Sequence, residues 1–188
     1  MRIIAGIAKG TPLVVPSGGN VRPTSDRVRE AVFSSLGDRV IGADVLDLFA
    51  GTGALGLEAA SRGAHSVLFL EHNRPSLTAL YANIAAFKRH PGAASVLTVR
   101  AVDVFAEFAG LSRDGQVFSL IFADPPYGHT AQQLLDEPVL PSLLVENGSL
   151  VLESAKRDVL VPPPSWRLSR ESVYGDTRIS YLSVNHVE

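Results

Sequence analysis

Residues 124–127 form the tetrapeptide Asp124-Pro125-Pro126-Tyr127, which combines a carboxylate, two rigid prolines and an aromatic ring. A carboxylate and a backbone carbonyl can accept the two N–H bonds of a planar exocyclic amine and turn its lone pair out of the heterocycle, which makes the amine nucleophilic. Because proline fixes φ, Asp124 and the carbonyl of Pro125 can be held convergent at little entropic cost, and Tyr127 would stack on the base. Asp and Pro also favour turns, so a plain turn between a strand and a helix is the alternative interpretation.

The tetrapeptide follows an apolar run, residues 117–123, that is typical of a buried strand. Open α/β sheets bind their ligands in a crevice at the carboxyl ends of their strands. The position of the tetrapeptide therefore predicts an active-site loop.

A glycine-rich loop follows a second strand-like run, residues 45–49. Gly51, Gly53 and Gly56 have the spacing of a dinucleotide-binding loop, and an Ala- and Leu-rich helical stretch follows to about Arg62. The glycines could instead provide only a tight turn and close helix packing. Their strand–turn–helix context, in a chain that also carries the tetrapeptide and the acids described next, predicts a nucleotide cofactor.

Two acidic residues indicate which cofactor this loop binds. Asp47 interrupts an apolar strand, which is unfavourable unless its carboxylate is hydrogen-bonded or meets a cation such as the ammonium group of S-adenosylmethionine. A diphosphate cofactor would be repelled there. Glu71 ends the next strand, residues 66–70, about 20 residues after the loop, where an acid can bind two hydroxyls of an adenosine ribose. Glu71 thus supports a cofactor that contains adenosine, whether S-adenosylmethionine or a diphosphate cofactor. Asp47 favours S-adenosylmethionine.

A further acid, Asp103, comes after the strand-like run 95–99. At another carboxyl strand end, it could accept a hydrogen bond from the adenine amino group. It could also be the N-cap of a helix that continues to about Ala109, and one Asp often does both.

With these residues in hand, the chain resembles the Rossmann-like S-adenosylmethionine-dependent methyltransferases that modify amino groups. More closely, it resembles the bacterial family that methylates the exocyclic N2 of one guanine in small-subunit (16S) ribosomal RNA. The resemblance spans nearly the whole chain, and its segments are Met1–Gly6 with Lys9-Gly10, Arg22–Phe33, Asp47–Gly53 and Asp124–Tyr127. Many methyltransferases share the glycine loop and the tetrapeptide, whereas the arginine-rich N-terminal segment points to this family.

The resemblance implies an α/β fold of the Rossmann-like class I methyltransferase type, with a mostly parallel seven-stranded sheet that ends in an antiparallel hairpin. Residues 1–188 would form a single domain, in which residues 1–40 are an RNA-contacting extension, made of a short β-hairpin and a helix, on a cofactor-binding and catalytic core of residues 41–188. The implied methyl donor is S-adenosylmethionine, without a metal. The implied partner is small-subunit ribosomal RNA within a partly or fully assembled subunit, and we expect a monomer.

The residues expected at the site fall into three groups. The catalytic residues are Asp124, Pro125 and Tyr127. The cofactor-binding residues are Asp47, Phe49, Gly51, Gly53, Glu71, Asp103 and Val104. The RNA-binding residues are Lys9, Arg22, Arg27 and Arg29.

Composition excludes several classes of site and protein. The chain has no cysteine, so disulfides and thiolate metal sites are impossible, and its five histidines show no ligand spacing. No apolar run reaches the roughly 18 residues of a membrane helix, and the N-terminus lacks the pattern of a signal peptide. We therefore expect a cytoplasmic, metal-free enzyme that does not bind membranes.

The charge distribution favours the N-terminal end as the RNA-binding surface. The net charge of −2 does not itself indicate a nucleic-acid-binding protein, but residues 1–40 carry six basic and three acidic residues, a charge of +3 that leaves −5 for the remainder. A helix is expected to begin near Ser25, with Val28, Val32 and Leu36 as its buried stripe. Arg27 and Arg29 fall off this stripe and would be free to contact phosphate, although neighbouring acids could simply pair with them on a solvated face.

The remaining segments complete the expected sheet. Alternating strands and helices imply a parallel sheet with right-handed crossovers. The expected elements are an N-terminal hairpin of residues 2–6 and 13–15, helices 75–87 and 131–144, a strand 149–153, and a C-terminal hairpin of residues 166–174 and 179–184 around Gly175-Asp176.

Three other functions remain open from the sequence. The first is an amino-methyltransferase acting on adenine or cytosine in DNA or on a protein amide, although the amide class usually has Asn at the position of Asp124. The second is a nicotinamide-dependent oxidoreductase, which the glycines favour and Asp47 disfavours. The third is a non-catalytic RNA-binding or assembly factor with a relict cofactor site, which the intact pairing of loop and tetrapeptide disfavours.

Overall fold

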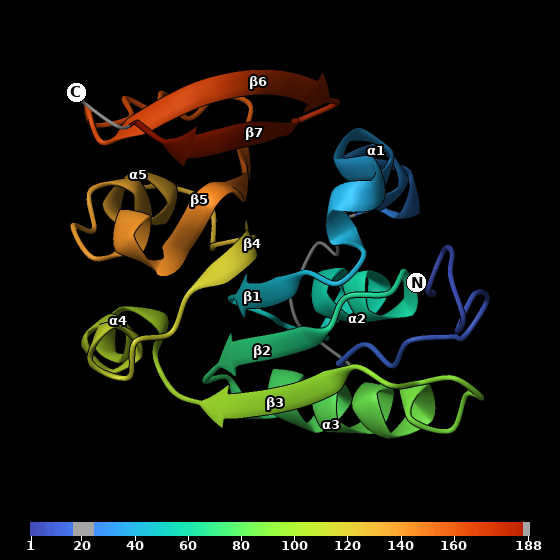
Figure 1. The fold of residues 1–188 in the computed structure, drawn as a ribbon. Helices are drawn as coiled ribbons and strands as arrows, with labels where there is room; N and C mark the ends of the chain where they lie inside the picture. Colours follow the sequence, from blue (N-terminus) through green and yellow to red (C-terminus); the bar gives the residue numbers. More distant parts are fainter. Residues whose placement is uncertain (17–24, 186–188) are drawn as a thin grey trace.

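The computed structural model describes residues 1–16 and 25–185, which form one seven-stranded sheet between two layers of helices (Figure 1). The strand order is β3-β2-β1-β4-β5-β7-β6. Strands β1 to β5 pair in parallel, whereas β7 runs antiparallel to both β5 and β6. The predicted mostly parallel sheet with an antiparallel C-terminal hairpin is confirmed.

The elements of the described residues have the following bounds. The strands are β1 (Asp44–Leu48), β2 (Ser66–Glu71), β3 (Val96–Ala101), β4 (Phe118–Ala123), β5 (Leu144–Ala155), β6 (Trp166–Tyr174) and β7 (Thr177–Val184). The α-helices are α1 (Asp26–Leu36), α2 (Ala54–Ser61), α3 (Arg74–Phe87), α4 (Val104–Arg113) and α5 (Thr130–Leu135), and the 3₁₀ helices are η1 (Gly37–Val40) and η2 (Leu140–Leu143).

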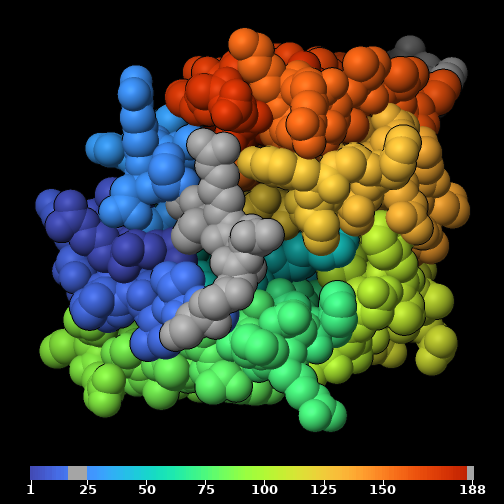
Figure 2. All heavy atoms as spheres, turned by 180° about the vertical axis from the view of Figure 1, so that it is seen from behind, coloured from blue at the N-terminus to red at the C-terminus, as the bar shows by residue number. Residues whose placement is uncertain are grey.

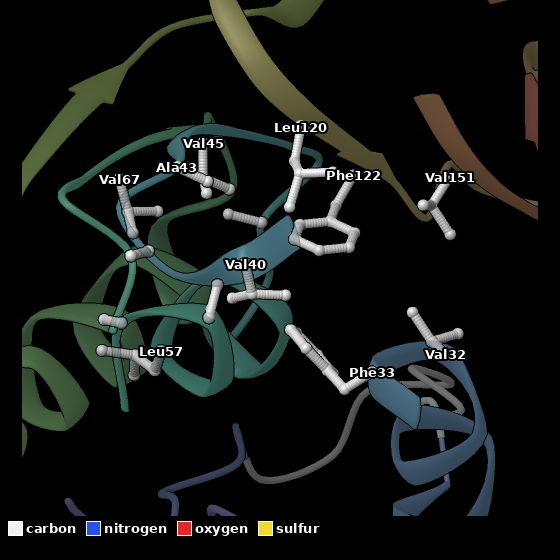
Figure 3. Packing of buried hydrophobic residues seen from close by; sticks show 14 of the residues in the cluster. Val32, Phe33, Val40, Ala43, Val45, Leu57, Val67, Leu120, Phe122 and Val151 are labelled. Carbon is white, nitrogen blue, oxygen red and sulfur yellow. The ribbon is translucent and has the colours of Figure 1, made fainter. Parts of the chain in front are cut away.

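Two hydrophobic clusters cover the two faces of the sheet, because successive side chains of a strand point to opposite faces. Val45 of β1 belongs to the cluster with α1, α2 and α3, whereas its neighbour Leu46 belongs to the cluster with α4 and α5. Figure 3 shows the first cluster, where Phe33 of α1 faces Phe122 of β4 with ring centroids 5.5 Å apart. The central strands are therefore buried on both faces and form a rigid base for the loops at their ends.

The strand register brings the carboxyl ends of the parallel strands to one edge of the sheet. Leu48, at the end of β1, pairs with Leu70 of β2 and with Ala123 of β4. Glu71 pairs with Ala101 at the end of β3. The chain proceeds from β1 to β2 and β3 in one direction and from β4 to β5 in the other, so the strand order reverses between β1 and β4. Open α/β sheets typically bind their ligands at such a topological switch point.

Helix α1 begins as predicted. Ser25 is its N-cap, and the Ser25 hydroxyl accepts a hydrogen bond from the backbone N–H of Val28 at 3.3 Å. The predicted stripe of Val28, Val32 and Leu36 is buried. In Figure 3, Val32 of this stripe and its neighbour Phe33 point toward the sheet residues Val151 of β5 and Phe122 of β4.

The N-terminal segment contains less β-structure than predicted. Its antiparallel pairing is a short, isolated bridge between Arg2 and Pro12, flanked by backbone hydrogen bonds that join residues 1–3 to residues 10–13, and it does not extend to the predicted residues 4–6 and 14–15. The backbone N–H groups of Ile4 and Ala5 donate to the carboxylate of Glu58 in α2, at 2.6 and 3.0 Å, instead of to a partner strand. The segment therefore docks on a helix rather than forming a regular hairpin.

The helix predicted from Ala131 to Leu144 is also shorter than expected. Helix α5 ends at Leu135, and η2 follows before β5 begins at Leu144. Pro138 and Pro141 account for the difference, because proline lacks the N–H that a helix needs and disfavours the helical conformation of the preceding residue. Of the helices in residues 1–16 and 25–185, none is long and apolar enough to span a membrane.

Candidate active site

The glycine-rich loop connects β1 to α2 in a sharp turn. Gly51 and Gly53 have φ values of 56° and 77°, a region that favours glycine. A Cβ on Gly53 would lie 2.4 Å from Cδ1 of Leu80, and a Cβ on Gly56 would lie 2.3 Å from a ring atom of Phe69. The packing role is therefore confirmed for Gly53 and Gly56. A Cβ on Gly51 would meet nothing closer than 3.8 Å, so a ligand can approach the backbone there.

Asp47 is the buried acid next to this loop. Its side chain is 2% exposed, and Oδ2 accepts a hydrogen bond from the N–H of Gly56 at 2.9 Å. Burial raises the pKa of Asp47 well above its usual range despite this hydrogen bond, and the charges of Asp124 and Glu71 raise the pKa further. Asp124 and Glu71 thus disfavour a negative charge on Asp47 by repulsion. A cationic ligand group would relieve this repulsion.

Glu71 links the end of β2 to the glycine loop. Oε2 accepts from the N–H of Gly51 at 2.8 Å, and Oε1 accepts from the N–H groups of His72 and Asn73 at 2.8 and 2.7 Å. A carboxylate can accept about four hydrogen bonds, so one acceptor position remains for a ribose hydroxyl. Binding two hydroxyls, as expected from the sequence, requires the exchange of one of these backbone bonds.

The start of α4 forms the next part of the edge. Oδ1 of Asp103 accepts from the N–H groups of Phe105 and Ala106 at 3.0 and 3.1 Å, which confirms Asp103 as N-cap. Val104, the first helical residue, is buried. The ring of Phe49 lies 6.1 Å from that of Phe105, and Phe49 has a φ of 57°, a strained backbone conformation of the kind that gathers at functional sites. The contacts of Phe49, Asp103 and Val104 with a cofactor stay predictions.

The tetrapeptide leaves β4 beside the glycine loop, because β4 and β1 are hydrogen-bonded neighbours. Asp124 is half-buried and Pro125 is buried. Tyr127 is 42% exposed, and its hydroxyl lies 3.3 Å from Oγ1 of Thr177 at the start of β7. The structure thus brings the tetrapeptide and the predicted cofactor loop to one place and leaves part of the Tyr127 ring accessible for stacking.

The chemistry of these residues fits S-adenosylmethionine. Asp47 lies among like charges, so an ammonium or sulfonium cation is stabilised here, whereas a diphosphate adds to the repulsion. The open approach at Gly51 and the remaining acceptor position of Glu71 suit an adenosine ribose. Within the described part of the chain, no group of three or more His, Cys, Asp or Glu side chains is placed to hold a metal ion.

Comparison with known proteins identifies the family. A family model described as conserved hypothetical protein 95 matches residues 1–183. The ribosomal RNA small subunit methyltransferase D of Escherichia coli strain K12 is 36% identical over 182 residues, which cover 93% of this chain and 85% of that protein. The chain belongs to the ribosomal RNA small subunit methyltransferase D family.

Solved structures have the same fold as this methyltransferase D family member. A hypothetical protein from Thermus thermophilus superposes with a TM-score of 0.83 and 30% identity, over 98% of this chain and 99% of that one. A more distant protein, SMU.776, described as a methyltransferase and solved in complex with SAH, has a TM-score of 0.64 and 18% identity, over 84% of this chain and 48% of that one. This second likeness is one of fold.

The RNA-binding residues predicted for this methyltransferase D family member differ in accessibility. Lys9 and Arg27 are exposed, as contact with phosphate requires. Arg22 lies outside the described residues. The prediction that Arg29 is free to contact phosphate is wrong, because its side chain is fully buried.

Arg29 is buried by partners far along the chain. Nη2 donates to the backbone carbonyl of Arg2 at 2.6 Å and to Oδ1 of Asp26 at 2.7 Å. Nη1 lies 3.7 Å from Oε2 of Glu58, which is itself fully buried. In this methyltransferase D family member, Arg29 therefore joins α1 and the N-terminal segment to α2.

Sequence reasoning missed the side chains that dock the N-terminal segment. Glu58 accepts two backbone hydrogen bonds from this segment. The hydroxyl and the backbone carbonyl of Ser61 also form hydrogen bonds with the backbone of the segment. A Cβ on Gly6 would lie 1.8 Å from the carbonyl oxygen of Ser61, so only glycine permits this approach. The signal was present, since Glu58 is the one charged residue in the Ala- and Leu-rich stretch 54–61.

Asn83 connects the N-terminal segment to the glycine loop. Its side-chain oxygen accepts from the N–H of Val14 at 2.7 Å, and its Nδ2 donates to the carbonyl oxygens of Val14 and Thr52 at 3.0 and 2.9 Å. Asn83 is 1% exposed. In Figure 2 the blue N-terminal residues lie against the green region that contains α3. The side-chain amide of Asn83 is thus hydrogen-bonded both to the N-terminal segment and to the loop that is predicted to bind the cofactor.

Proposed function

We propose that this protein transfers a methyl group from S-adenosylmethionine to the exocyclic N2 amine of a guanine in small-subunit ribosomal RNA. One observation carries this proposal: the glycine loop with its buried Asp47 and the tetrapeptide that begins at Asp124 leave adjacent strands at the same edge of the sheet. The names of the relatives support ribosomal RNA as the substrate. The SAH bound by a protein of similar fold supports the methyl donor.

The cofactor would be held by residues at the ends of three neighbouring strands, β1, β2 and β3. Asp47 would attract the ammonium group, Glu71 would accept from a ribose hydroxyl, and Asp103 with Val104 would contact the adenine. Phe49 would line the same site beside Gly51 and Gly53. The donor supplies an electrophilic methyl group on a positively charged sulfur.

The tetrapeptide would orient the nucleophile. The carboxylate of Asp124 and the carbonyl of Pro125 accept the two N–H bonds of the guanine amine, while Tyr127 stacks on the base. The nitrogen would then attack the methyl carbon in line with the C–S bond. The N–C bond would form as the C–S bond breaks, the sulfur would leave as the neutral thioether of S-adenosylhomocysteine, and the nitrogen would afterwards lose one proton to solvent. Positioning and stabilisation of the positive charge on nitrogen supply the catalysis, so no covalent enzyme intermediate and no strong base before attack are needed.

Residues 1–40 would be an RNA-contacting extension of a single methyltransferase domain. Exposed Lys9 and Arg27, together with Arg22, would bind phosphates, while Arg29 would hold the extension in place. A base must leave its stack to enter the pocket, so a loop nucleotide is a better target than a paired one. We further propose that an assembled small-subunit particle in the cytoplasm is the substrate, because so small a surface benefits from ribosomal proteins that present the RNA. Equal rates on naked RNA and on particles would contradict this last point.

The decisive experiment uses isotopically labelled S-adenosylmethionine and unmodified small-subunit particles. After incubation the RNA is digested, and labelled nucleosides are identified by mass spectrometry. N2-methylguanosine at one position is the expected result. Label in another base or in protein keeps the methyltransferase activity but contradicts the substrate, and no label despite cofactor binding favours a non-catalytic RNA-binding factor.

A pair of aspartate variants tests the mechanism. Asp124→Ala should lower kcat by at least about 100-fold while cofactor binding persists, because a pre-positioned acceptor of this kind typically contributes that much. The control is Asp114→Ala, at the exposed C-terminal end of α4, which should retain the parent rate. Turnover of Asp124→Ala within a few-fold of the parent would show that the proposed mechanism is wrong.

A further inference from the structure

A groove lies between the start of α1 and the turn that joins β6 to β7. Its volume is about 320 Å³, and its lining residues are Ser25, Arg27, Val28, Val173, Tyr174 and Gly175. The two walls come from segments almost 150 residues apart in sequence. In Figure 2 the light-blue α1 region and the red region of the last two strands lie close together on this face.

The groove is near the carboxyl edge of the sheet, where the tetrapeptide lies. Leu152 of β5 pairs with Ala123 at the end of β4. Ala155 lies beyond Leu152 along β5, and it pairs with Thr177 of β7. The Tyr127 hydroxyl lies 3.3 Å from Oγ1 of Thr177. Tyr174 is the partner of Thr177 across the antiparallel pair, a separation of about 5 Å. Through Thr177, the groove residue Tyr174 therefore lies close to Tyr127, the aromatic residue that would stack on the target base.

The two walls of the groove differ in chemistry. On one wall, Arg27 is exposed and makes no ion pair within the described residues, and the N-terminal end of α1 favours negative charge. The first-turn acid Asp26 is offset by Arg29 at 2.7 Å and Arg2 at 3.7 Å. On the other wall, Val173 is 45% exposed and Tyr174 is half-buried. A cationic wall facing an aromatic and apolar wall suits a nucleotide, which has a phosphate and a flat base.

We propose that this groove binds a nucleotide of the RNA next to the target base, with the phosphate on Arg27 and the base or ribose against Tyr174. This inference rests on the proposed function, since it assumes an RNA substrate whose target base lies at Tyr127. It assigns to Tyr174 a role in substrate recognition, and it gives the phosphate contact of Arg27 a defined place in the path of the RNA.

The test compares four variants with the parent: Arg27→Ala, Tyr174→Leu, Tyr174→Phe and the control Arg113→Ala, an exposed arginine at the end of α4. Affinity for purified small-subunit particles is measured without cofactor at several salt concentrations, and kcat and KM are measured with cofactor. Thermal unfolding shows that each variant is folded. Calorimetry measures the affinity for S-adenosylmethionine, which no variant should change.

Arg27→Ala should weaken particle binding and reduce the slope of log affinity against log salt by about 1, as expected for the loss of one phosphate contact. Tyr174→Leu should weaken binding about 5- to 100-fold through lost stacking, whereas Tyr174→Phe should stay within about twofold of the parent. For both weakened variants KM should rise with little change in kcat. Parent-like binding by Arg27→Ala and Tyr174→Leu would overturn the groove assignment.

The two proposals fail in different ways. If the groove variants lose affinity while the label appears in a base other than guanine, the groove assignment stands and the guanine substrate is overturned. If the parent methylates guanine while every variant binds particles equally well, the proposed function stands and the groove assignment is overturned.

Discussion

Asp47→Asn should change cofactor affinity and protein stability in opposite directions. Asn is nearly the same size, and its side-chain oxygen can still accept the 2.9 Å hydrogen bond from Gly56, so the loop should keep its shape. The negative charge is lost. A hydrogen bond to a charged group contributes about 1.5–3 kcal/mol against roughly 1 kcal/mol for a neutral one, so affinity for S-adenosylmethionine should fall by about 0.5–2 kcal/mol, or about 2- to 30-fold.

The stability of the unliganded Asp47→Asn variant should equal or exceed that of the parent. Burial and the charges of Asp124 and Glu71 raise the pKa of Asp47, so its ionised form destabilises the folded state as the pH rises above the unfolded value. Removing the charge relieves this penalty, by roughly 1 kcal/mol at neutral pH. Binding of a cation would return the pKa of Asp47 toward its usual range. Parent affinity should therefore rise with pH, with release of a proton, until Asp47 is ionised in the unliganded protein, and the variant should lack this dependence.

The assays are calorimetric titration with S-adenosylmethionine in buffers of different ionisation enthalpy, and urea unfolding of the unliganded protein. Asp44→Asn is the control, because Asp44 is on the same strand but at its other end, where Ser66 and His65 hydrogen-bond it. This control should bind the cofactor as the parent does. Unchanged affinity in Asp47→Asn, or a variant that is both weaker in binding and less stable, would refute the assignment of a cation-binding role to this carboxylate.

Three further outcomes follow from the packing and charge of the same molecule. Gly56→Ala should lower the free energy of unfolding by about 1–3 kcal/mol in urea titrations, because its Cβ would lie 2.3 Å from the Phe69 ring. The control is Gly110→Ala in α4, where the nearest atoms belong to the side chain of Glu107, and it should raise the free energy of unfolding by about 0.5–1 kcal/mol. Equal effects of the two substitutions would contradict the packing argument. Glu58→Gln should destabilise by about 3 kcal/mol, since it leaves the buried charge of Arg29 without this partner, and a change below about 0.5 kcal/mol would count against the network. Hydrogen bonds from Ser66 and His65 lower the pKa of Asp44. The contribution of Asp44 to stability is therefore present above the pKa of the unfolded state and is lost as the pH falls through the pKa of the folded state. Ser66→Ala should make the loss of stability below about pH 4 less steep, and an unchanged dependence of stability on pH would contradict this.

The sequence was sufficient to predict the positions of the site residues relative to the strands. Asp47, Glu71 and Asp124 lie at or next to strand ends because short apolar runs mark buried strands and parallel strands end at a common edge. The C-terminal hairpin was predictable for a similar reason, since Gly175-Asp176 interrupts an alternating pattern. The cofactor and RNA contacts of these residues stay predictions.

The sequence could not show where tertiary partners override local pattern. Arg29 falls outside the apolar stripe of α1, and its burial depends on Glu58, which lies 29 positions later. The N-terminal hairpin was overestimated because the donors of Ile4 and Ala5 are taken by that same carboxylate. The isolated charge of Glu58 indicates that it needs a buried partner, but local periodicity does not identify which distant residues those partners are.

The docking of the N-terminal segment determines when the protein can complete its fold during synthesis. Hydrogen bonds join Ile4 to Glu58 and Val14 to Asn83, across 54 and 69 positions of the chain. These N-terminal residues therefore leave the ribosome before their docking partners, α2 and then α3, have been made. Because contacts between distant positions form slowly, this segment should settle late, although it is synthesised before its partners. Its basic side chains would be held in their final places only once the helices beside the glycine loop have folded.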